Sequence, residues 1–475
     1  MNLFIKRTAP VLGLLGLGLT SCQPEIEAPA ASPGSADFSR YVSVGNSLTA
    51  GFSDGGLYRE GQLNSYPNIL AQQFRLVGGG DFVQPLFTEA QSNGSGYLRL
   101  AGFTPAGSPI TASVTTGLAV RGGTAQAPLY TKFTDPVNNL AVPGIRMGDV
   151  QTPGYGSVQG NPYFERITPD NTPLQTYLQR VQATVASIKP TFFTEWLGNN
   201  DVLGYATSGG ASAATSNTLT PVATFTTNAN LVLDALTAGG AKGVVITIPD
   251  VTGIPFFTTV GPSFKATLVA NNVPGVVALT GAAPGAAASG NRKPLATADI
   301  RDANGGRQLF TLTSAPFLGL LGRPTGAPWR SFVPKTALAT YLSAYAIDTT
   351  QAFGVSAGNP IPSSFVLDDV EQGLAGTATT AFNSALVAAA GARNLAVFDA
   401  NTFFRSVASG GYVVNAANNT ANYLSGNLFG LDGVHPTPRG YAVIASEMLK
   451  VINAKYGSSI PGVNANTYRG VVFPQ

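Results

Sequence analysis

Short apolar runs alternate along the chain with segments whose apolar residues recur every three or four positions. The runs lie at residues 41–44, 140–142, 191–197, 243–248 and 395–398, and each ends next to Gly, Asn, Asp or Pro. Continuous apolar runs of this length are typical of parallel strands that are buried on both faces. The helical spacing recurs around residues 174–188, 225–236, 370–390 and 441–452. This alternation predicts an α/β fold in which helices cover both faces of a parallel sheet.

Three stretches do not follow the alternation: residues 88–135, 205–220 and 252–365. The last of them is more than a hundred residues long and rich in Gly, Pro and Ala, and only residues 336–347 show helical spacing. An irregular loop of this length is uncommon inside a compact domain, so the stretch is interpreted as an insertion with a small fold of its own.

The N-terminus resembles a bacterial lipoprotein signal. Lys6 and Arg7 precede eleven apolar residues at 9–19, and a short small-residue site ends in Cys22. The apolar segment is too short to span a bilayer, which needs about 20 residues. The pattern implies a signal peptide at 1–21, acylation of Cys22 and a flexible Pro-, Ala- and Ser-rich tether at 22–37. The expected location is the bacterial cell envelope, anchored by lipid to the outer membrane.

Composition narrows the possible functions of this 475-residue chain, in which 44% of residues are hydrophobic and only 11% are charged. Removal of the signal lowers the formal charge from +3 to +1, which leaves no basic excess for nucleic acid. The only cysteine excludes disulfides within the chain and Cys-rich metal sites. No metal or other cofactor is expected.

The single histidine, His435, excludes every mechanism that needs two imidazoles, including HExxH zinc sites. A lone histidine is more often structural than catalytic, but Asp432 stands three residues before it, across a glycine-containing turn. Such a carboxylate can reach the ring Nδ1–H and fix the tautomer of a general base. Thr437 as N-cap and Pro438 at the first helical position are predicted to begin the last helix.

The most suitable nucleophile is Ser47, which follows the first predicted strand in a turn bracketed by Gly45 and Gly51. The carboxyl ends of parallel strands are where open α/β sheets bind their ligands. Gly144 and Asn200 follow two later strands and are candidate donors to a developing oxyanion. Each of these residues is also common in ordinary turns, so the argument rests on their combination.

In this order the residues resemble the SGNH hydrolases, or GDSL-type esterases and lipases. Ser47 matches the nucleophile, Gly144 and Asn200 match oxyanion donors, and Asp432 with His435 matches the DxxH motif. The resemblance implies a flavodoxin-like α/β/α sandwich of three layers with about five parallel strands, spanning 38–457 and followed by a C-terminal extension at 458–475. The insertions at 88–135 and 252–365 lie within that domain. It also implies an oxyanion hole made of the N–H groups of Ser47 and Gly144 and the amide of Asn200. Asn46 departs from the family, which has Asp before the serine, and is interpreted as a variant of a structural residue.

Several other residues are weaker candidates for a place in the active site. Ser356 lies in a GxSxG sequence, but two prolines follow it where the nucleophile elbow of α/β-hydrolases needs a helix, so the match is interpreted as chance. Glu195 and Trp196 are expected in the core or behind the site. Asp250 follows the fourth strand and is a candidate for lining the site. The aromatic residues Phe256, Phe257 and Trp329 are candidates for substrate contact from the large insertion.

The predicted function is hydrolysis of carboxylic esters through an acyl-enzyme on Ser47. Two alternatives remain open: an O-acetylesterase that acts on envelope or dietary glycans, and a catalytically inert surface-binding lipoprotein with a hydrolase fold. The expected partners are a small-molecule or lipid ester or an acylated glycan, and the membrane through the lipid anchor. Low charge and many apolar residues suit all of these substrates.

Overall fold

Four parallel strands form the central sheet of the computed structural model, which describes residues 30–474 except 106, 211–216 and 282–290. Their spatial order is β1 (Tyr41–Gly45), β6 (Phe192–Trp196), β7 (Lys242–Ile246) and β12 (Ala396–Phe398). Every residue of β1 and β6 is buried, as the continuous apolar runs predict. Four of the five predicted strands are therefore confirmed. The signal peptide and Cys22 lie outside the described residues.

The fifth predicted strand, at residues 140–142, is not a regular strand, and the residue before it, Asn139, forms an isolated parallel bridge with Ser43. Its segment follows the edge of β1 with three hydrogen bonds of 2.9 Å, from Ser43 N to Asn138 O, from Leu140 N to Ser43 O and from Val142 N to Gly45 O. Pro143 ends the run because it has no N–H to donate. The segment is nevertheless aligned with the sheet, so the turn after it lies at the carboxyl end of β1.

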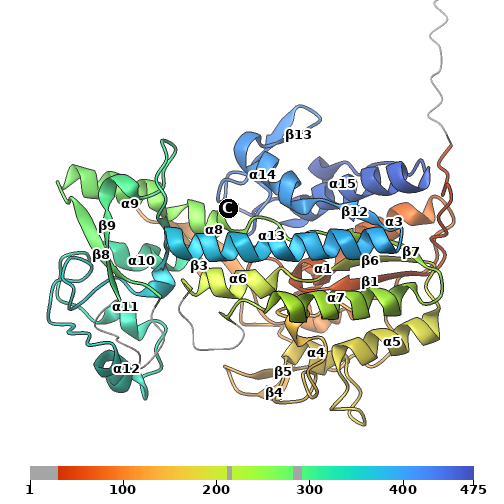
Figure 1. The fold of residues 1–475 in the computed structure, drawn as a ribbon, viewed down its shortest axis with the longest axis horizontal. Coiled ribbons are helices and arrows are strands. Elements are labelled where there is room, and N and C mark those ends of the chain that lie inside the picture. Colours follow the sequence, from red (N-terminus) through yellow and green to blue (C-terminus); the bar gives the residue numbers. More distant parts are fainter. Residues whose placement is uncertain (1–29, 106, 211–216, 282–290, 475) are drawn as a thin grey trace, which may run out of the picture. The chain divides into compact units, whose positions relative to one another are not determined.

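The helices form two groups, and the strands of the sheet lie between these groups in Figure 1. One group consists of α5 (Tyr177–Ile188), α7 (Val222–Thr237) and α13 (Asp369–Ala392), and the other includes α3 (Tyr66–Arg75) and α15 (Pro438–Tyr456). Four predicted helices are confirmed by α5, α7, α13 and α15. The remaining elements of this part are α1 (Ser47–Ala50), α2 (Arg59–Leu63), α4 (Pro162–Ile167), α6 (Asn200–Thr207), α14 (Ala400–Gly410), β13 (Tyr412–Val414) and β14 (Ala417–Asn419).

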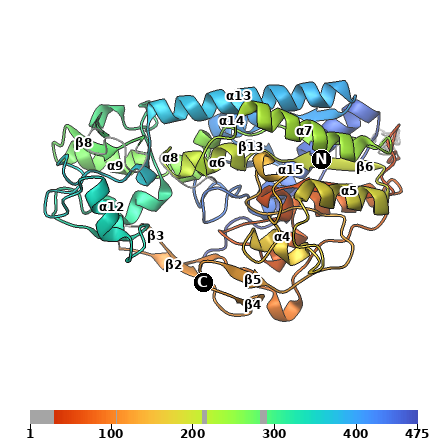
Figure 2. The same cartoon turned by 60° about the horizontal axis from the view of Figure 1, so that its bottom comes forward.

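The segments outside the alternation are built mainly from hairpins and short helices, and α12 (Leu338–Ala344) of the larger one lies apart from the sheet in both Figure 1 and Figure 2. Residues 88–135 form the hairpins β2 (Leu98–Phe103) with β3 (Pro109–Ser113) and β4 (Val120–Gly123) with β5 (Pro128–Tyr130). Within 252–365, a cluster of buried side chains separate from the main core includes Phe264, Phe310 and Phe353. The elements of this part of the chain are α8 (Pro255–Thr258), α9 (Val260–Ala270), β8 (Gly275–Leu279), β9 (Arg292–Ala296), β10 (Leu309–Phe310), α10 (Ala315–Leu318), α11 (Ala327–Arg330), α12 (Leu338–Ala344) and β11 (Val366–Leu367).

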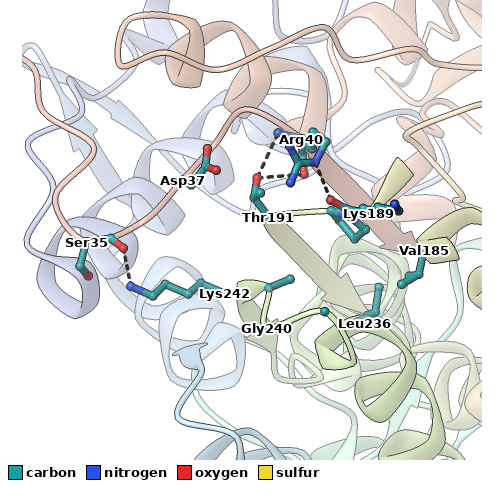
Figure 3. Close-up of a pocket in the computed structure, with 12 residues that line it drawn as sticks. Ser35, Asp37, Arg40, Val185, Lys189, Thr191, Leu236, Gly240 and Lys242 are labelled. Carbon is teal, nitrogen blue, oxygen red and sulfur yellow. Dashed lines mark hydrogen bonds between the residues drawn. The ribbon is translucent and has the colours of Figure 1, made fainter. Parts of the chain in front are cut away.

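The N-terminal edge of the sheet holds the chain that leads into β1. Ser35 N donates to Tyr456 O at 2.8 Å, and the ammonium of Lys242 donates to Ser35 O. Arg40 bonds Thr191 and the carbonyl of Lys189 (Figure 3). The part of the predicted tether around Ser35 is thus fixed to the sheet, and residues 31–475 form one compact unit.

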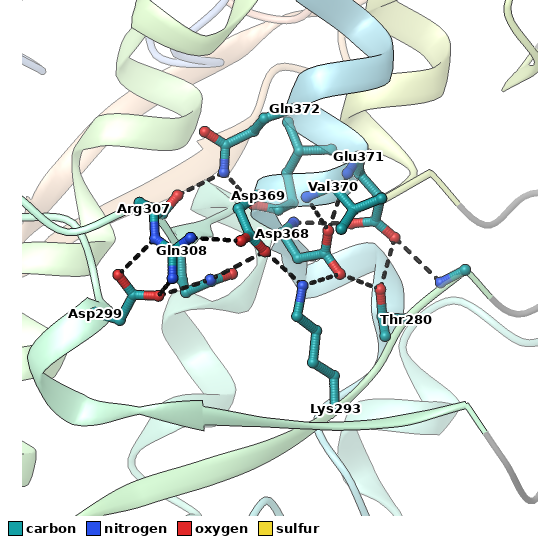
Figure 4. A network of polar contacts seen from close by, with 12 residues as sticks. Thr280, Lys293, Asp299, Arg307, Gln308, Asp368, Asp369, Val370, Glu371 and Gln372 are labelled. Atoms are coloured by element: carbon teal, nitrogen blue, oxygen red, sulfur yellow. Dashed lines mark hydrogen bonds and ion pairs between the residues drawn. The ribbon is translucent and has the colours of Figure 1, made fainter.

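A polar network joins the large insertion to the start of α13 (Figure 4). Lys293 of β9 contacts the carboxylates of Asp368 and Asp369 at 3.0 and 2.5 Å, and Arg307 bridges Asp369 and Asp299. Asp368 also caps the helix by accepting the N–H groups of its first turn. The network therefore anchors the insertion to the helix layer.

No helix within the described residues is long and apolar enough to cross a membrane.

Replacing Leu233 by Ala is expected to destabilise the protein by about 2–5 kcal/mol, because the side chain is fully buried in α7 and its removal leaves a cavity. Leu374→Ala in α13 is the matched control. That leucine is 51% exposed, so its loss should change stability by no more than about 0.5 kcal/mol. Urea-induced unfolding of the two variants measures the difference, and similar midpoints would contradict the packing described.

Candidate active site

Ser47 is the first residue of α1, and only Asn46 separates it from the end of β1. The side chain of Asn46 caps this helix by accepting the N–H of Leu48 at 3.1 Å. A Cβ on Gly45 would lie 2.0 Å from Thr49 Oγ1, so only glycine permits this close approach. The role of Asn46 is thus structural: its side-chain oxygen accepts the capping hydrogen bond, which needs no negative charge.

The segment from Gly430 to His435 forms a tight loop that leads into α15. Gly430 N donates to His435 O at 2.8 Å. Gly433 has a φ of +68°, and its carbonyl accepts the N–H of Phe256 at 2.9 Å, so the large insertion supports this loop from behind. Thr437 caps α15 and Pro438 is its first residue, as the sequence predicts.

The two loops bring Ser47, His435 and Asp432 together, although 388 positions separate the first two. His435 Nε2 lies 2.9 Å from Ser47 Oγ, and His435 Nδ1 lies 2.8 Å from Asp432 Oδ2. Burial acts to raise the pKa of Asp432, but the charge and hydrogen bonds of His435 and the backbone N–H of Val434 hold it below its usual value. An ionised carboxylate only accepts, so Nδ1 carries the proton and Nε2 is left to accept the serine proton.

Two carboxylates clamp the loops to each other in a reciprocal arrangement. Asp432, on the histidine loop, accepts the N–H of Gly55 at 2.7 Å. Asp54, on the serine loop, accepts the N–H of Leu431 at 2.8 Å. Burial raises the pKa of Asp54. The clamp holds the distance between nucleophile and imidazole through backbone bonds on both sides of the site.

The C-terminal extension contributes to this clamp. Tyr58 donates to Asp54 at 3.0 Å and accepts from Arg469, which is itself paired with Glu60.

Asp54 was not predicted from the sequence. The available signal was its place in the turn Ser-Asp-Gly-Gly seven residues after the nucleophile, but its partner lies 377 positions away.

An aromatic ring orients the imidazole. The Phe52 ring packs against His435 with 4.5 Å between centroids, and the carbonyl of Phe52 accepts a hydrogen bond of 2.6 Å from Tyr441 of α15. Phe52 is only partly buried, so it forms an apolar wall beside the reacting atoms. This residue was also missed by the sequence reasoning.

Gly144 and Asn200 meet in the turn that follows the segment bonded to β1. The Asn200 amide donates to Ile145 O at 2.9 Å, and Gly144 has a φ of +84°. Within the described residues the N–H groups of Ser47 and Gly144 have no hydrogen-bond acceptor. These two donors and the second amide hydrogen of Asn200 are therefore available to a ligand.

Asp201, beside Asn200, fixes this turn by accepting the N–H groups of Met147 at 2.6 Å and Gly148 at 3.0 Å. Burial raises the pKa of Asp201 to about 6. The sequence motif contained this residue, but no role had been assigned to it. The structure shows it linking α6 to the glycine turn.

The remaining candidates lie away from the triad or in the core. Ser356 sits among turns without a flanking strand or helix and bonds Gln351, so the chance interpretation of GxSxG is confirmed. Glu195 and Trp196 are fully buried, as expected. Trp329 is also fully buried and bonds Asn359, so it is not a substrate contact. Phe256 and Phe257 are buried in the core too, and the backbone N–H of Phe256 bonds the histidine loop.

Asp250 lines an apolar cavity of about 260 Å³ between α14 and the residues before the histidine loop, together with Ile254 and Phe429. Its carboxylate caps the following turn and lies 3.7 Å from Arg405. The expectation that Asp250 lines the catalytic site itself stays a prediction.

No group of three or more His, Cys, Asp or Glu side chains in the described residues is placed to hold a metal ion. The chain matches no protein-family model, and no curated protein sequence matches it significantly. The geometry of the site is therefore the main support for a functional conclusion.

The buried carboxyl of Glu195 makes stability depend on pH. Burial raises the pKa of Glu195 to about 8, against 4.5 for the free group, so folding binds a proton between these values. Stability then falls as pH rises through this range, because ionisation is easier in the unfolded chain. We expect Glu195→Gln to remove this loss, so that its advantage over the wild type in urea unfolding grows from about pH 5 to about pH 9. An advantage that does not change with pH would contradict the assignment.

Proposed function

We propose that the protein is a serine ester hydrolase of the SGNH, or GDSL-type, family, acting through an acyl-enzyme. The observation that carries this proposal is the continuous hydrogen-bonded chain from Ser47 through His435 to Asp432. We further propose that the fold is the flavodoxin-like α/β/α sandwich of that family, in which the bridged segment 138–142 takes the place of a fifth strand. The location proposed is the cell envelope, through the acylated Cys22.

The first half-reaction is acylation of Ser47. The imidazole of His435 takes the hydroxyl proton at Nε2 as Oγ attacks the ester carbonyl carbon. Asp432 stabilises the resulting imidazolium through Nδ1–H. When the tetrahedral intermediate collapses, the proton passes from Nε2 to the leaving alkoxide, and an alcohol departs. Water then repeats the same proton transfers, releases the carboxylic acid and restores the free serine.

The negative charge on the carbonyl oxygen needs fixed donors in both half-reactions. The free N–H groups of Ser47 and Gly144 and the amide of Asn200 are suited to this role, since preorganised donors stabilise the oxyanion more than the neutral carbonyl. The hydrogen bond from the Asn200 amide to Ile145 O and the bonds that Asp201 accepts hold this turn in place. Such rigidity is what stabilisation of the oxyanion by fixed donors requires.

Ser47→Ala is expected to abolish hydrolysis of p-nitrophenyl esters and labelling by a fluorophosphonate probe, with the fold unchanged by circular dichroism. Ser356→Ala is the matched control, because Ser356 lies in a familiar nucleophile motif but has no imidazole beside it. That variant should keep full activity. Labelling that persists in Ser47→Ala and disappears in Ser356→Ala would overturn the assignment.

Asn200→Ala should lower kcat by about 10²–10³ with a smaller change in KM, since the lost donor acts mainly in the transition state. Asn68→Ala is the control. Asn68 also donates its amide to a backbone carbonyl, that of Leu63, but it lies in α3 away from the triad. Equal losses of kcat in both variants would contradict a direct role of Asn200.

A further inference from the structure

Basic side chains gather at the N-terminal edge of the central sheet. Two adjoining cavities of about 430 and 500 Å³ lie there and share Ser35, Gly240, Ala241 and Lys242. Figure 3 shows the first of them. The cationic residues that line them, here called the basic edge, are Arg40, Lys189, Lys242, Arg393 and Lys455. They come from the ends of different strands and helices, so the fold and not a local sequence run assembles them.

Few carboxylates oppose these cations. Asp37 lines the first cavity, and Asp234 pairs with Arg393 at 2.6 Å. Residues 30–475 contain 25 Lys and Arg against 22 Asp and Glu, an excess of +3. The basic edge with its two carboxylates carries the same excess, so the rest of this unit is neutral overall. The positive charge of the unit is therefore concentrated on one edge.

This edge also holds the chain that leads back to the predicted anchor. Ser35 is fixed there by Tyr456 and Lys242. Cys22 lies only thirteen residues before Ser35, and a flexible chain of that length has a root-mean-square end-to-end distance of about 20 Å. An acyl group on Cys22 would thus keep the basic edge close to the membrane surface, where clusters of Lys and Arg are attracted to anionic headgroups.

The triad lies at the other end of the same strands. Arg40 immediately precedes β1 and Ser47 follows it, which separates the two edges by about 20 Å along the strand direction. The same holds for β6, with Thr191 before it and Asn200 after it. If one edge faces the membrane, the other faces away from it.

We propose that the basic edge rests on the anionic headgroups of the membrane that holds the lipid anchor, and that the catalytic edge faces the aqueous phase. The substrate is then an ester that arrives from solution, such as an acylated glycan or a soluble ester, and not a lipid of the anchoring bilayer. This inference rests on the proposed function and on acylation of Cys22.

The basic edge is tested with the unacylated chain 23–475 and vesicles of phosphatidylcholine with or without phosphatidylglycerol. Binding should require the anionic lipid and weaken with salt. Lys189→Gln with Lys455→Gln should lower the partition coefficient at least about tenfold. The control pair Arg99→Gln with Lys335→Gln removes the same charge from exposed positions elsewhere. An equal loss in the control pair, or binding without anionic lipid, would overturn the assigned surface.

The orientation is tested with the acylated protein in vesicles that contain a fluorogenic ester lipid, beside a water-soluble ester. We expect hydrolysis of the soluble ester only. Inserting about 40 Gly and Ser residues after residue 29, with a reach of about 35 Å, should release the embedded ester to hydrolysis and leave the soluble rate unchanged. Equal hydrolysis of the embedded ester by both forms would overturn the orientation. No hydrolysis of either ester would instead refute the proposed function.

Discussion

The hydrogen bond between Ser47 and His435 is the contact on which the rest of the site depends. It joins residues 388 positions apart, so every element between them must be placed correctly before it forms. The sheet supplies the direction of the serine loop, and α15 supplies that of the histidine loop. The reciprocal bonds of Asp54 and Asp432 then set the final spacing. Both carboxylates bind backbone N–H groups of the opposite loop, so the clamp does not rely on flexible side-chain pairs.

Much of the fold could be predicted from periodicity alone. Runs such as that of β6 are buried on both faces and lack alternation, and α7 and α13 show clear helical spacing. The prediction of a strand at 140–142 was wrong. The residues of this segment are those of a short strand, and the sequence does not show that the segment bonds only to β1 and stops at a proline. The hairpins of the insertions were not predicted, since strands such as β3 and β4 are almost entirely exposed and so lack the buried apolar run used to recognise strands.

The central residues of the site were predictable because the chain has one imidazole and one serine in a suitable turn. The supporting residues were not. Asp54 and Phe52 have no recognisable role in the sequence, because their partners Leu431 and His435 lie in the distant histidine loop. Asp201 stood next to a predicted donor, but its bonds to Met147 and Gly148 depend on how α6 meets the glycine turn. Positions of this kind acquire their role only through tertiary structure.

The position of the sole imidazole of this sequence, 388 residues after the nucleophile, also governs when the protein becomes competent. A nascent polypeptide that has not reached residue 435 contains no imidazole, the side chain on which the proposed deprotonation of Ser47 depends. Arg469, which braces the clamp through Tyr58, is made later still. Any reaction that uses this pair is therefore silent until the ribosome has passed residue 435 and the histidine loop has folded against the serine loop.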